Sequence, residues 1–485
     1  MKNHLSITSF CSLSLLLSGC MVGPKYVKPN VPTPPDFKEQ APESFKEVDG
    51  WKPAQPGDQT LRGKWWEIFG DSQLNALEDE LTASNQDLKV SEARFRQARS
   101  MIRFNRSAEF PTISTSPSVA NERESANAPY FPSSAVNNGT GNFTLPFDLS
   151  YEVDLWGKVR RTVNASREEA QASAADLQTA SLSLHAELAL DYFELRSADA
   201  QKQLLDDTVK AYADALNLTR NRFQGGAAPE SDVVQAQTQL EKAEVDDTDV
   251  TVLRAQYEHA IATLIGKPPA SFSLTFAPQT PLHLPTIPVG LPATLLERRP
   301  DIAAGERRVA EANEQIGIAR AAYYPSLVLG AEGGLAGTTI ANLFSWPSRM
   351  WAIGPQMSQT LFDAGRRHAV SETANANYDG TVATYRQTTL TAFQEVEDNL
   401  AALRILETEA QQQQRATASA SRSVQLFTQR YEGGVDNYLQ VITAQTTLLT
   451  NQRNDLDIQR RRMDASVLLI KAVGGGWDTT QLPKL

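Results

Sequence analysis

The chain has 485 residues, of which 41 % are hydrophobic and 21 % are charged, and its formal net charge is −11. This length is ample for a large folded core. The acidic balance argues against nucleic acid as a partner, because no concentration of positive charge is available to release counterions from phosphate.

Residues 1–19 have the pattern of a signal peptide. Lys2 supplies the positive start, and the apolar stretch from Leu5 to Leu17 is too short for a finished transmembrane helix. The stretch ends in LSGC, in which small residues precede Cys20. This arrangement resembles the lipobox of bacterial lipoproteins and predicts lipidation at Cys20. An ordinary secretory signal with an incidental cysteine is the alternative.

Further expectations follow from this N-terminus. Met21 rather than Asp follows Cys20, which favours the outer membrane as the destination of a lipoprotein. Cys11 leaves with the signal, so the mature chain has no thiol for a disulfide or a cysteine metal site. Residues 20–50 are Pro-rich and predict an extended tether between the lipid and the folded body. We expect no cofactor and no metal beyond the covalent lipid.

The remainder of the chain is an internal duplication. RFQGG at Arg222 and RYEGG at Arg430 begin two similar segments 208 residues apart. A second pair, ending at Ile113 and at Leu327, is 214 residues apart. The expected units are a first repeat over 51–265, a linker over 266–294, a second repeat over 295–473 and a tail over 474–485.

Each repeat begins with a helical pattern. Apolar residues recur at seven-residue intervals, which is typical of a coiled coil. They are Leu74, Leu81, Leu88, Phe95 and Ile102 in the first repeat, and Leu295, Ile302, Val309 and Ile316 in the second. The first helix is expected to run without a break from Leu74 to Glu109, and a proline then ends it.

Two strands around a polar loop follow in each repeat. In NFTLPFDLSYEVDL, apolar and polar residues alternate over a length that fits a tilted membrane strand better than a soluble one. A soluble β-layer is the alternative. The side chains expected to face lipid are Phe143, Leu145, Phe147, Leu149, Tyr151, Val153 and Leu155. The second repeat has Trp351, Ile353, Met357 and Leu361 on the equivalent face, and aromatic residues such as Trp156, Trp346 and Phe362 near the strand ends suit an interfacial belt.

Long segments without proline come next, from Trp156 to Arg222 and from Phe362 to Tyr431. At 1.5 Å per residue, each predicts a helix of roughly 100 Å, which needs partners for its apolar stripe. After a glycine turn, shorter helices return over Ser231–Ile265 and Asn437–Val473. We expect the two short helices of each repeat to stack end to end beside the long one.

Four membrane strands per chain pose a closure problem. An open sheet edge is not tolerated in lipid, and the smallest practical barrel has about eight strands. The chain must therefore associate with copies of itself, and either two or three copies would provide enough strands. The helices would continue as a ring of coiled coils, which suggests a conduit and not an enzyme.

Several motifs carry a family resemblance. The lipobox followed by VGPKYVKP, the segments LLERRPDI and IGIARAAYYPSL, the two GG…AQT turns and the terminal AVGGGW resemble the TolC-type outer-membrane efflux factors, specifically their NodT/OprM-like lipoprotein branch. The resemblance extends from Cys20 to Trp477. It implies a mostly α-helical homotrimer with a twelve-stranded β-barrel in the outer membrane and a twelve-helix coiled-coil tunnel in the periplasm.

The resemblance also implies a function. The trimer would be the exit duct of a tripartite, RND-type efflux system that exports small molecules such as drugs, with a periplasmic adaptor and an inner-membrane pump as partners. One alternative is a duct of the same architecture in a type I protein-secretion system. Another is a purely structural periplasmic coiled-coil lipoprotein.

The glycine turns Gly225-Gly226 and Gly433-Gly434 should form the tips of the helical hairpins and permit positive φ. A phosphate loop would need a preceding strand and a following Lys-Ser/Thr, and neither is present. The turns are also where an adaptor would dock, with Arg222 and Arg430 nearby.

Two residues near the second turn match gate residues of the resembled family. Asp436 matches the acidic constriction residue of the lipoprotein branch, and three copies would form a carboxylate ring that repels anions. The alternative is that Asp436 only caps the returning helix. Tyr431 matches a tyrosine that ties the closed helices together in TolC. Gln440 and Thr443 stand where TolC has further aspartates, which argues against a second acidic ring.

No catalytic site is expected. The five histidines are scattered along the chain, and no HExxH or GxSxG pattern occurs. Trp65 and Trp66 are expected to be packing anchors of a belt, formed with the Pro-rich linker, that wraps the helices; contact with a pump is the alternative.

Overall fold

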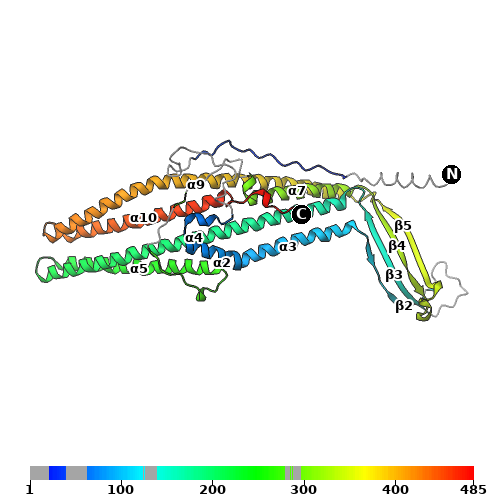
Figure 1. Ribbon diagram of the computed structural model, residues 1–485, viewed down its shortest axis with the longest axis horizontal. Coiled ribbons are helices and arrows are strands. Elements are labelled where there is room, and N and C mark those ends of the chain that lie inside the picture. Colours follow the sequence, from blue (N-terminus) through cyan, green and yellow to red (C-terminus); the bar gives the residue numbers. More distant parts are fainter. Residues whose placement is uncertain are drawn as a thin grey trace.

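The computed structural model describes residues 21–39, 63–123, 125, 139–278, 284–285, 287 and 296–485. The predicted signal peptide, Cys20 and Leu295 lie outside the described residues. Long helices run side by side along the longest axis, and a β-sheet is attached at one end (Figure 1).

The long helices and the returning helices are confirmed. Helices α4 (Lys158–Gln224) and α9 (Arg366–Glu432) have 67 residues each, and α5 (Glu230–Leu264) and α10 (Tyr438–Ala472) have 35 each. Each long helix forms a hairpin with the short helix that follows it (Figure 1). No helix in the described ranges is long and apolar enough to cross a membrane.

The prediction of one unbroken first helix is wrong. The segment forms α2 (Ser72–Ser84) and α3 (Gln86–Arg106), followed by a 3-10 turn over Ser107–Glu109. Asn85 separates the helices because its side chain accepts a hydrogen bond from the Leu88 N–H, as an N-cap does. Its Nδ2 also donates to the carbonyl of Leu264 at 2.7 Å, so the break is where α5 ends beside α2.

The helical pattern at the start of the second repeat is interrupted at Arg299. Helix α7 spans Pro300–Ala321, and the described residues 296–298 are helical but are not part of α7. Arg299 is extended because the residue before a proline is disfavoured in the helical region. The heptad residues inside α7, namely Ile302, Val309 and Ile316, are all buried, as expected.

The short helices stack end to end, as predicted. Ser84 at the end of α2 donates to the carbonyl of Ile265, just past α5. In the second half, Arg299 before α7 donates to the carbonyl of Ala472 at the end of α10. Each long helix therefore has a continuous line of shorter helices beside it.

The sheet is antiparallel and has four strand positions. The order is β1 (Thr112–Ser114), β3 (Thr140–Val153), β4 (Ser326–Gly337) and β5 (Arg349–Ser358), and β2 (Ser118–Glu122) also pairs with β3. β1 and β2 pair with different parts of β3, so together they occupy one position. The expected first strand is therefore interrupted, near Pro117, which cannot donate to a ladder.

The register places apolar side chains in rows on one face. The rows of paired residues are Leu145–Leu335–Arg349, Phe147–Gly333–Trp351, Leu149–Ala331–Ile353, Tyr151–Leu329–Pro355 and Val153–Leu327–Met357. The opposite face carries Thr144, Asp148, Ser150, Glu152, Glu332 and Gln356 among others. Six of the seven residues expected to face lipid thus share one face, whereas Leu155 lies past the end of β3.

The largest hydrophobic core lies midway along the helices and not at their ends. Trp65, Trp66 and Phe69 of the 3-10 helix η3 (Trp65–Phe69) pack there against α2, α4, α5 and α10. The described linker joins them through Leu274 and Ile287, after the short η5 (Pro269–Ser271). Both tryptophans are at most 5 % exposed, so their predicted role as packing anchors is confirmed.

Residues 21–39, the described part of the predicted tether, form a strap along the helices. The Val22 N–H donates to the carbonyl of Trp156, which lies between β3 and α4. Arg161 of α4 donates to the carbonyls of Val22 and Pro24 and pairs with Glu314 of α7 at 2.8 Å. At its other end, Glu39 pairs with Arg404 of α9. The strap is thus fixed to three helices.

Candidate functional site

The two hairpin tips lie at the end of the helices opposite the sheet (Figure 1). Both turns have the same hydrogen bonds: the Ala227 N–H donates to the Arg222 carbonyl, and the Val435 N–H donates to the Arg430 carbonyl. This is the Schellman ending of a helix, which requires a left-handed residue. Gly226 and Gly434 supply it, each with φ of 73°.

The first glycine of each pair differs from the expectation of positive φ. Gly225 has φ of −80° and Gly433 has φ of −74°, both values open to other residues. Only one left-handed position is needed to end the helix, so each second glycine meets the backbone requirement. The glycines form helix-ending turns and show no phosphate-loop geometry.

A cluster of aromatic and aliphatic side chains joins the two tips. Tyr431 at the end of α9 and Tyr438 at the start of α10 are 3 % and 2 % exposed, and their ring centroids are 5.2 Å apart. Leu216 of α4 and Ala236 of α5 pack into the same cluster. Burial raises the pKa of the Tyr438 hydroxyl to about 12. The cluster therefore holds one hairpin against the other.

Arg222 crosses between the hairpins. Its Nη1 donates to the carbonyl of Glu432 at 2.9 Å, and its guanidinium carbon lies 4.8 Å from the centre of the Tyr431 ring. Farther from the tip, Arg453 of α10 pairs with Asp246 of α5 at 3.2 Å. Tyr431, Arg222 and these neighbours therefore form a tie that must be broken if the hairpins separate.

Asp436 lies in the second turn and pairs with Arg430. The Arg430 Nε is 2.5 Å from Oδ2 of Asp436, and its Nη2 donates to Oδ1 at 3.1 Å. These hydrogen bonds hold the pKa of the Asp436 carboxyl below its usual value. The alternative role as helix cap is wrong, because Asn437 occupies the N-cap position before α10.

The ion pair changes what a ring of Asp436 residues could do. A bare carboxylate would attract cations and repel anions, whereas a carboxylate with a bidentate guanidinium partner has much of its charge neutralised. Arg430 is the more exposed partner, with a side chain 55 % exposed against 17 % for Asp436. The tip thus presents an ion pair whose positive member faces outward.

A buried pair that the sequence pattern did not reveal lies in the middle of the molecule. The Nδ1 of His185, on α4, is 2.6 Å from Oε2 of Glu78, on α2, and both residues are buried. Burial raises the pKa of Glu78 to about 9 and lowers the pKa of His185 to about 4, so both are neutral near pH 7. The two lie 107 positions apart in sequence, so no local signal connects them.

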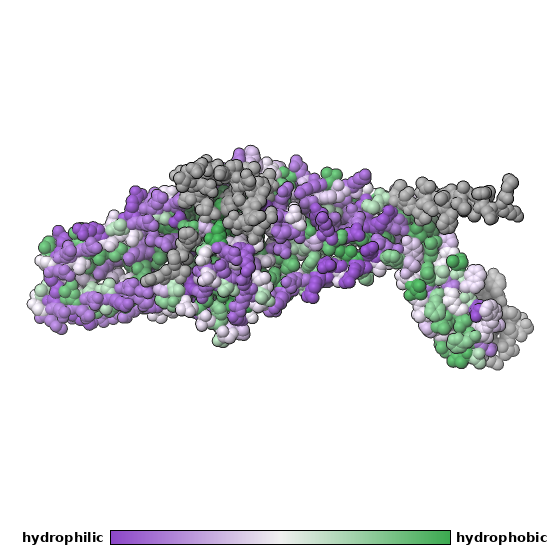
Figure 2. Space-filling view, viewed as in Figure 1, coloured by the Kyte–Doolittle hydropathy of each residue, from purple (hydrophilic) through white to green (hydrophobic). Residues whose placement is uncertain are grey.

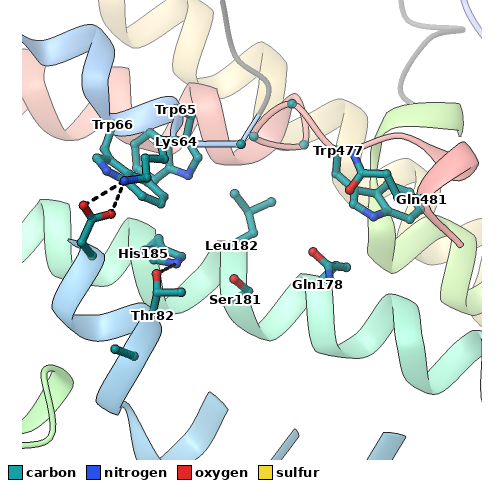
Figure 3. Close-up of a pocket in the computed structure, with 16 residues that line it drawn as sticks. Lys64, Trp65, Trp66, Thr82, Gln178, Ser181, Leu182, His185, Trp477 and Gln481 are labelled. Carbon is teal, nitrogen blue, oxygen red and sulfur yellow. Dashed lines mark hydrogen bonds and ion pairs between the residues drawn. The ribbon is translucent and has the colours of Figure 1, made fainter. Parts of the chain in front are cut away.

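His185 of this pair lines a cavity of about 470 Å³. Figure 3 shows Trp65 and Trp66 of η3 on one side, Gln178, Ser181, Leu182 and His185 along α4, and Trp477 with Gln481 of the C-terminal segment on the other. The Trp66 ring stacks on His185 with centroids 4.3 Å apart. Here the start of the first repeat meets the end of the second.

Elsewhere along the helices, a cluster of charged side chains joins α4 to α10. Arg460 contacts Glu194 of α4 at 2.5 Å, and Asp457 and Asp464 of its own helix. Burial raises the pKa of Asp464 to about 7. Among the described residues, no group of three or more His, Cys, Asp or Glu side chains could hold a metal ion.

A sheet with one apolar face that continues into long helical hairpins is the arrangement expected of a membrane channel. Comparison with known proteins gives the family. The family model described as "Outer membrane efflux protein" matches residues 77–267 and 291–475, and the chain belongs to this family.

Individual relatives agree over nearly the full length. The chain is 33 % identical to the toluene efflux pump outer membrane protein TtgF of Pseudomonas putida, over 99 % of this chain and 98 % of TtgF. It is 30 % identical to the outer membrane protein OprJ of Pseudomonas aeruginosa, over 96 % and 95 %. The CmeC outer membrane channel of Campylobacter jejuni superposes with a TM-score of 0.87 at 25 % identity, over 95 % of this chain and 96 % of CmeC. The predicted class of outer-membrane efflux component is confirmed.

Proposed function

We propose that this protein is a homotrimeric, lipid-anchored channel that forms the exit duct of a tripartite efflux system. The sheet is the observation that carries the proposal. It has four strand positions, one apolar face, and outer strands (β1 with β2, and β5) that pair on one side only within the described residues. Unpaired backbone groups in lipid cost several kcal/mol each, so the sheet requires other copies of itself.

Closure alone does not fix the number of copies. Three chains would contribute about twelve strands and leave a lumen, whereas two would give about eight with an interior filled by side chains. A conduit requires the lumen, and the resemblance to TolC-type channels also favours three. The polar face of the sheet, with Asp148, Glu152 and Glu332, would line the lumen.

The strap supports lipidation at Cys20. It brings Val22 beside Trp156 and Met21 beside Gly157, at the helical end of the sheet. A lipid on Cys20 would therefore lie at the membrane surface from which the helices extend. The helices would then extend into the periplasm, with the tips about 100 Å away, given 1.5 Å per residue over α4 and α9.

The partners and cargo follow from this placement. The tips would meet a periplasmic adaptor, and an RND-type inner-membrane pump would supply the energy. Small molecules are the proposed cargo, which the naming of TtgF for toluene efflux supports. The protein would carry out no chemistry of its own, since a duct needs only a lumen and a gate.

We assign the gate to the tips, with Asp436, Arg430 and Tyr431 as its parts. The test is single-channel conductance of the purified protein in planar bilayers. Wild type should be nearly closed, and Asp436→Ala should conduct more and shift toward anions, because Arg430 loses its counterion. Asp207→Ala, an exposed change on α4, is the control. If neither wild type nor Asp436→Ala conducts, the channel function is wrong. If both conduct equally, Asp436 is not part of the gate.

A further inference from the structure

The apolar face of the sheet carries one charged residue within the described strands. That residue is Arg349, the first residue of β5, in the row with Leu145 and Leu335. A charge that faces lipid is costly at the membrane midplane and nearly free at the interface. The position of Arg349 along the sheet therefore decides what it can contact.

The height of the apolar band places Arg349 near the outer rim. The rows from Val153 to Phe143 span five two-residue steps, or roughly 33 Å along the strand at about 3.3 Å per residue. At the usual tilt of about 35–45° this corresponds to a band roughly 25 Å tall, as in outer-membrane barrels. The row of Arg349 is next to last, at the end farthest from the helices.

One exposed aromatic ring contacts Arg349, and two more lie within a few residues of it in sequence. Its guanidinium carbon lies 3.4 Å from the centre of the Trp346 ring, in the short η6 (Trp346–Ser348) that follows α8 (Ile340–Leu343). Trp346 is 75 % exposed, Trp351 two residues along β5 is 79 % exposed, and Phe344 is 73 % exposed. Figure 2 shows hydrophobic residues gathered over the sheet, in contrast to the hydrophilic helices. Such rings suit the headgroup level of a membrane.

Within the part of the chain that the structure describes, the charge of Arg349 has no acidic partner. No carboxylate in the described ranges pairs with it, and the contact with Trp346 covers one flat face of the guanidinium. The N–H groups at the edge of the guanidinium make no hydrogen bond to a described residue, and two parallel N–H groups match two oxygens of a phosphate. A cation at the lipid-facing rim, held flat on an indole, is therefore complementary to an anionic headgroup.

From this geometry we propose that Arg349 and Trp346 bind a phosphate of a lipid in the outer leaflet. The site rests on the proposed placement of the sheet in the outer membrane. The occupant is a membrane lipid and not a free phosphate, because the rings that flank the cation are exposed on the face that would contact acyl chains. Three such sites per trimer would fix the height of the barrel in the membrane.

The test is lipid retention by the intact, delipidated protein in detergent, measured by native mass spectrometry. The probe is bisphosphorylated lipid A, with zwitterionic phosphatidylcholine and excess inorganic phosphate as comparison arms. Arg349→Gln should weaken retention of lipid A about tenfold, the scale of a lost hydrogen bond to a charged group. Trp346→Leu should weaken it less. Arg422→Gln, an exposed change on α9 far from the sheet, should retain lipid A as wild type does.

Three results would overturn the site. They are equal retention by wild type and Arg349→Gln, equal retention of phosphatidylcholine and lipid A, or displacement of the lipid by inorganic phosphate alone. Dissociation of the Arg349→Gln trimer would instead place Arg349 at a contact between copies and would also overturn it. Conductance in bilayers is the separate readout: if neither wild type nor Asp436→Ala conducts, the proposed function is refuted, whatever lipid the protein retains.

Discussion

Replacing Gly317 by alanine should release the strap from the helices. Gly317 is in α7, and a Cβ at this position would lie 2.2 Å from Nε of Arg161. Arg161 has a side chain 3 % exposed, so it has no open space into which to move. The guanidinium must leave its place, and its ion pair with Glu314 and its hydrogen bonds to the strap carbonyls must break.

The expected cost is about 3 kcal/mol. Loss of a buried ion pair that leaves one charge uncompensated costs about 3–5 kcal/mol, and the gain in helix propensity from glycine to alanine returns up to about 1 kcal/mol. This free energy acts on local opening of the strap and not on the whole fold. A change of about 3 kcal/mol corresponds to roughly a 100-fold larger open population.

Limited proteolysis measures that population. Trypsin cleavage after Lys25, next to the Pro24 carbonyl that Arg161 holds, should be about 100-fold faster in Gly317→Ala when opening is fast relative to cleavage. Gly305→Ala is the matched control in the same helix, because its Cβ would meet Tyr385 at 3.4 Å, an ordinary distance. The reasoning would be refuted if Gly317→Ala were cleaved at the wild-type rate, or if Gly305→Ala were cleaved as much faster as Gly317→Ala.

Two further substitutions test the buried centre of the molecule. Folding raises the pKa of the Glu78 carboxyl from 4.5 to about 9, because the buried site favours the protonated form. The contribution of Glu78 to the free energy of unfolding is therefore fully present below pH 4.5 and is lost as the pH rises toward 9. At pH 7 the cost of keeping Glu78 protonated in the folded protein is about 3 kcal/mol of unfolding free energy. Glu78→Gln avoids this cost, and its amide can donate to His185. The variant should therefore be more thermostable than wild type at pH 8–9 but not at pH 5. Asn85→Ala should destabilise the protein by about 2–3 kcal/mol in thermal unfolding, because it removes a cap and leaves the Leu264 carbonyl unpaired, while Asn85→Asp should restore only the cap. Parallel pH profiles of Glu78→Gln and wild type, or equal stability of Asn85→Ala and wild type, would contradict these expectations.

Much of the fold was predictable because its elements are long and periodic. The absence of proline over each long segment predicts a continuous helix, because a proline inside a helix would kink or break it. The alternation along β3 assigns a face to each side chain without knowledge of its neighbours. The repeated RFQGG and RYEGG segments located both hairpin turns, since an αL position at a helix end favours glycine.

Breaks within elements were not predictable from the heptads. Leu81 and Leu88 keep the seven-residue interval across Asn85, and both are buried, yet the helix ends between them. The deciding contact is with the carbonyl of Leu264, 179 residues away. Periodicity records which residues are buried, and it carries no information on which distant backbone group needs a donor.

The sequence by itself determined the duplication, the helical lengths, the apolar face of the sheet and the residues at the tips. Only the tertiary structure paired Arg430 with Asp436, tied Arg222 to the opposite hairpin, buried Glu78 against His185 and set Arg349 on Trp346 at the rim of the apolar face. The physical reason is the range of the interactions. Period, turn chemistry and helix propensity act over a few residues, whereas the charge state of a carboxylate or an arginine depends on groups that only the folded chain brings within hydrogen-bond distance.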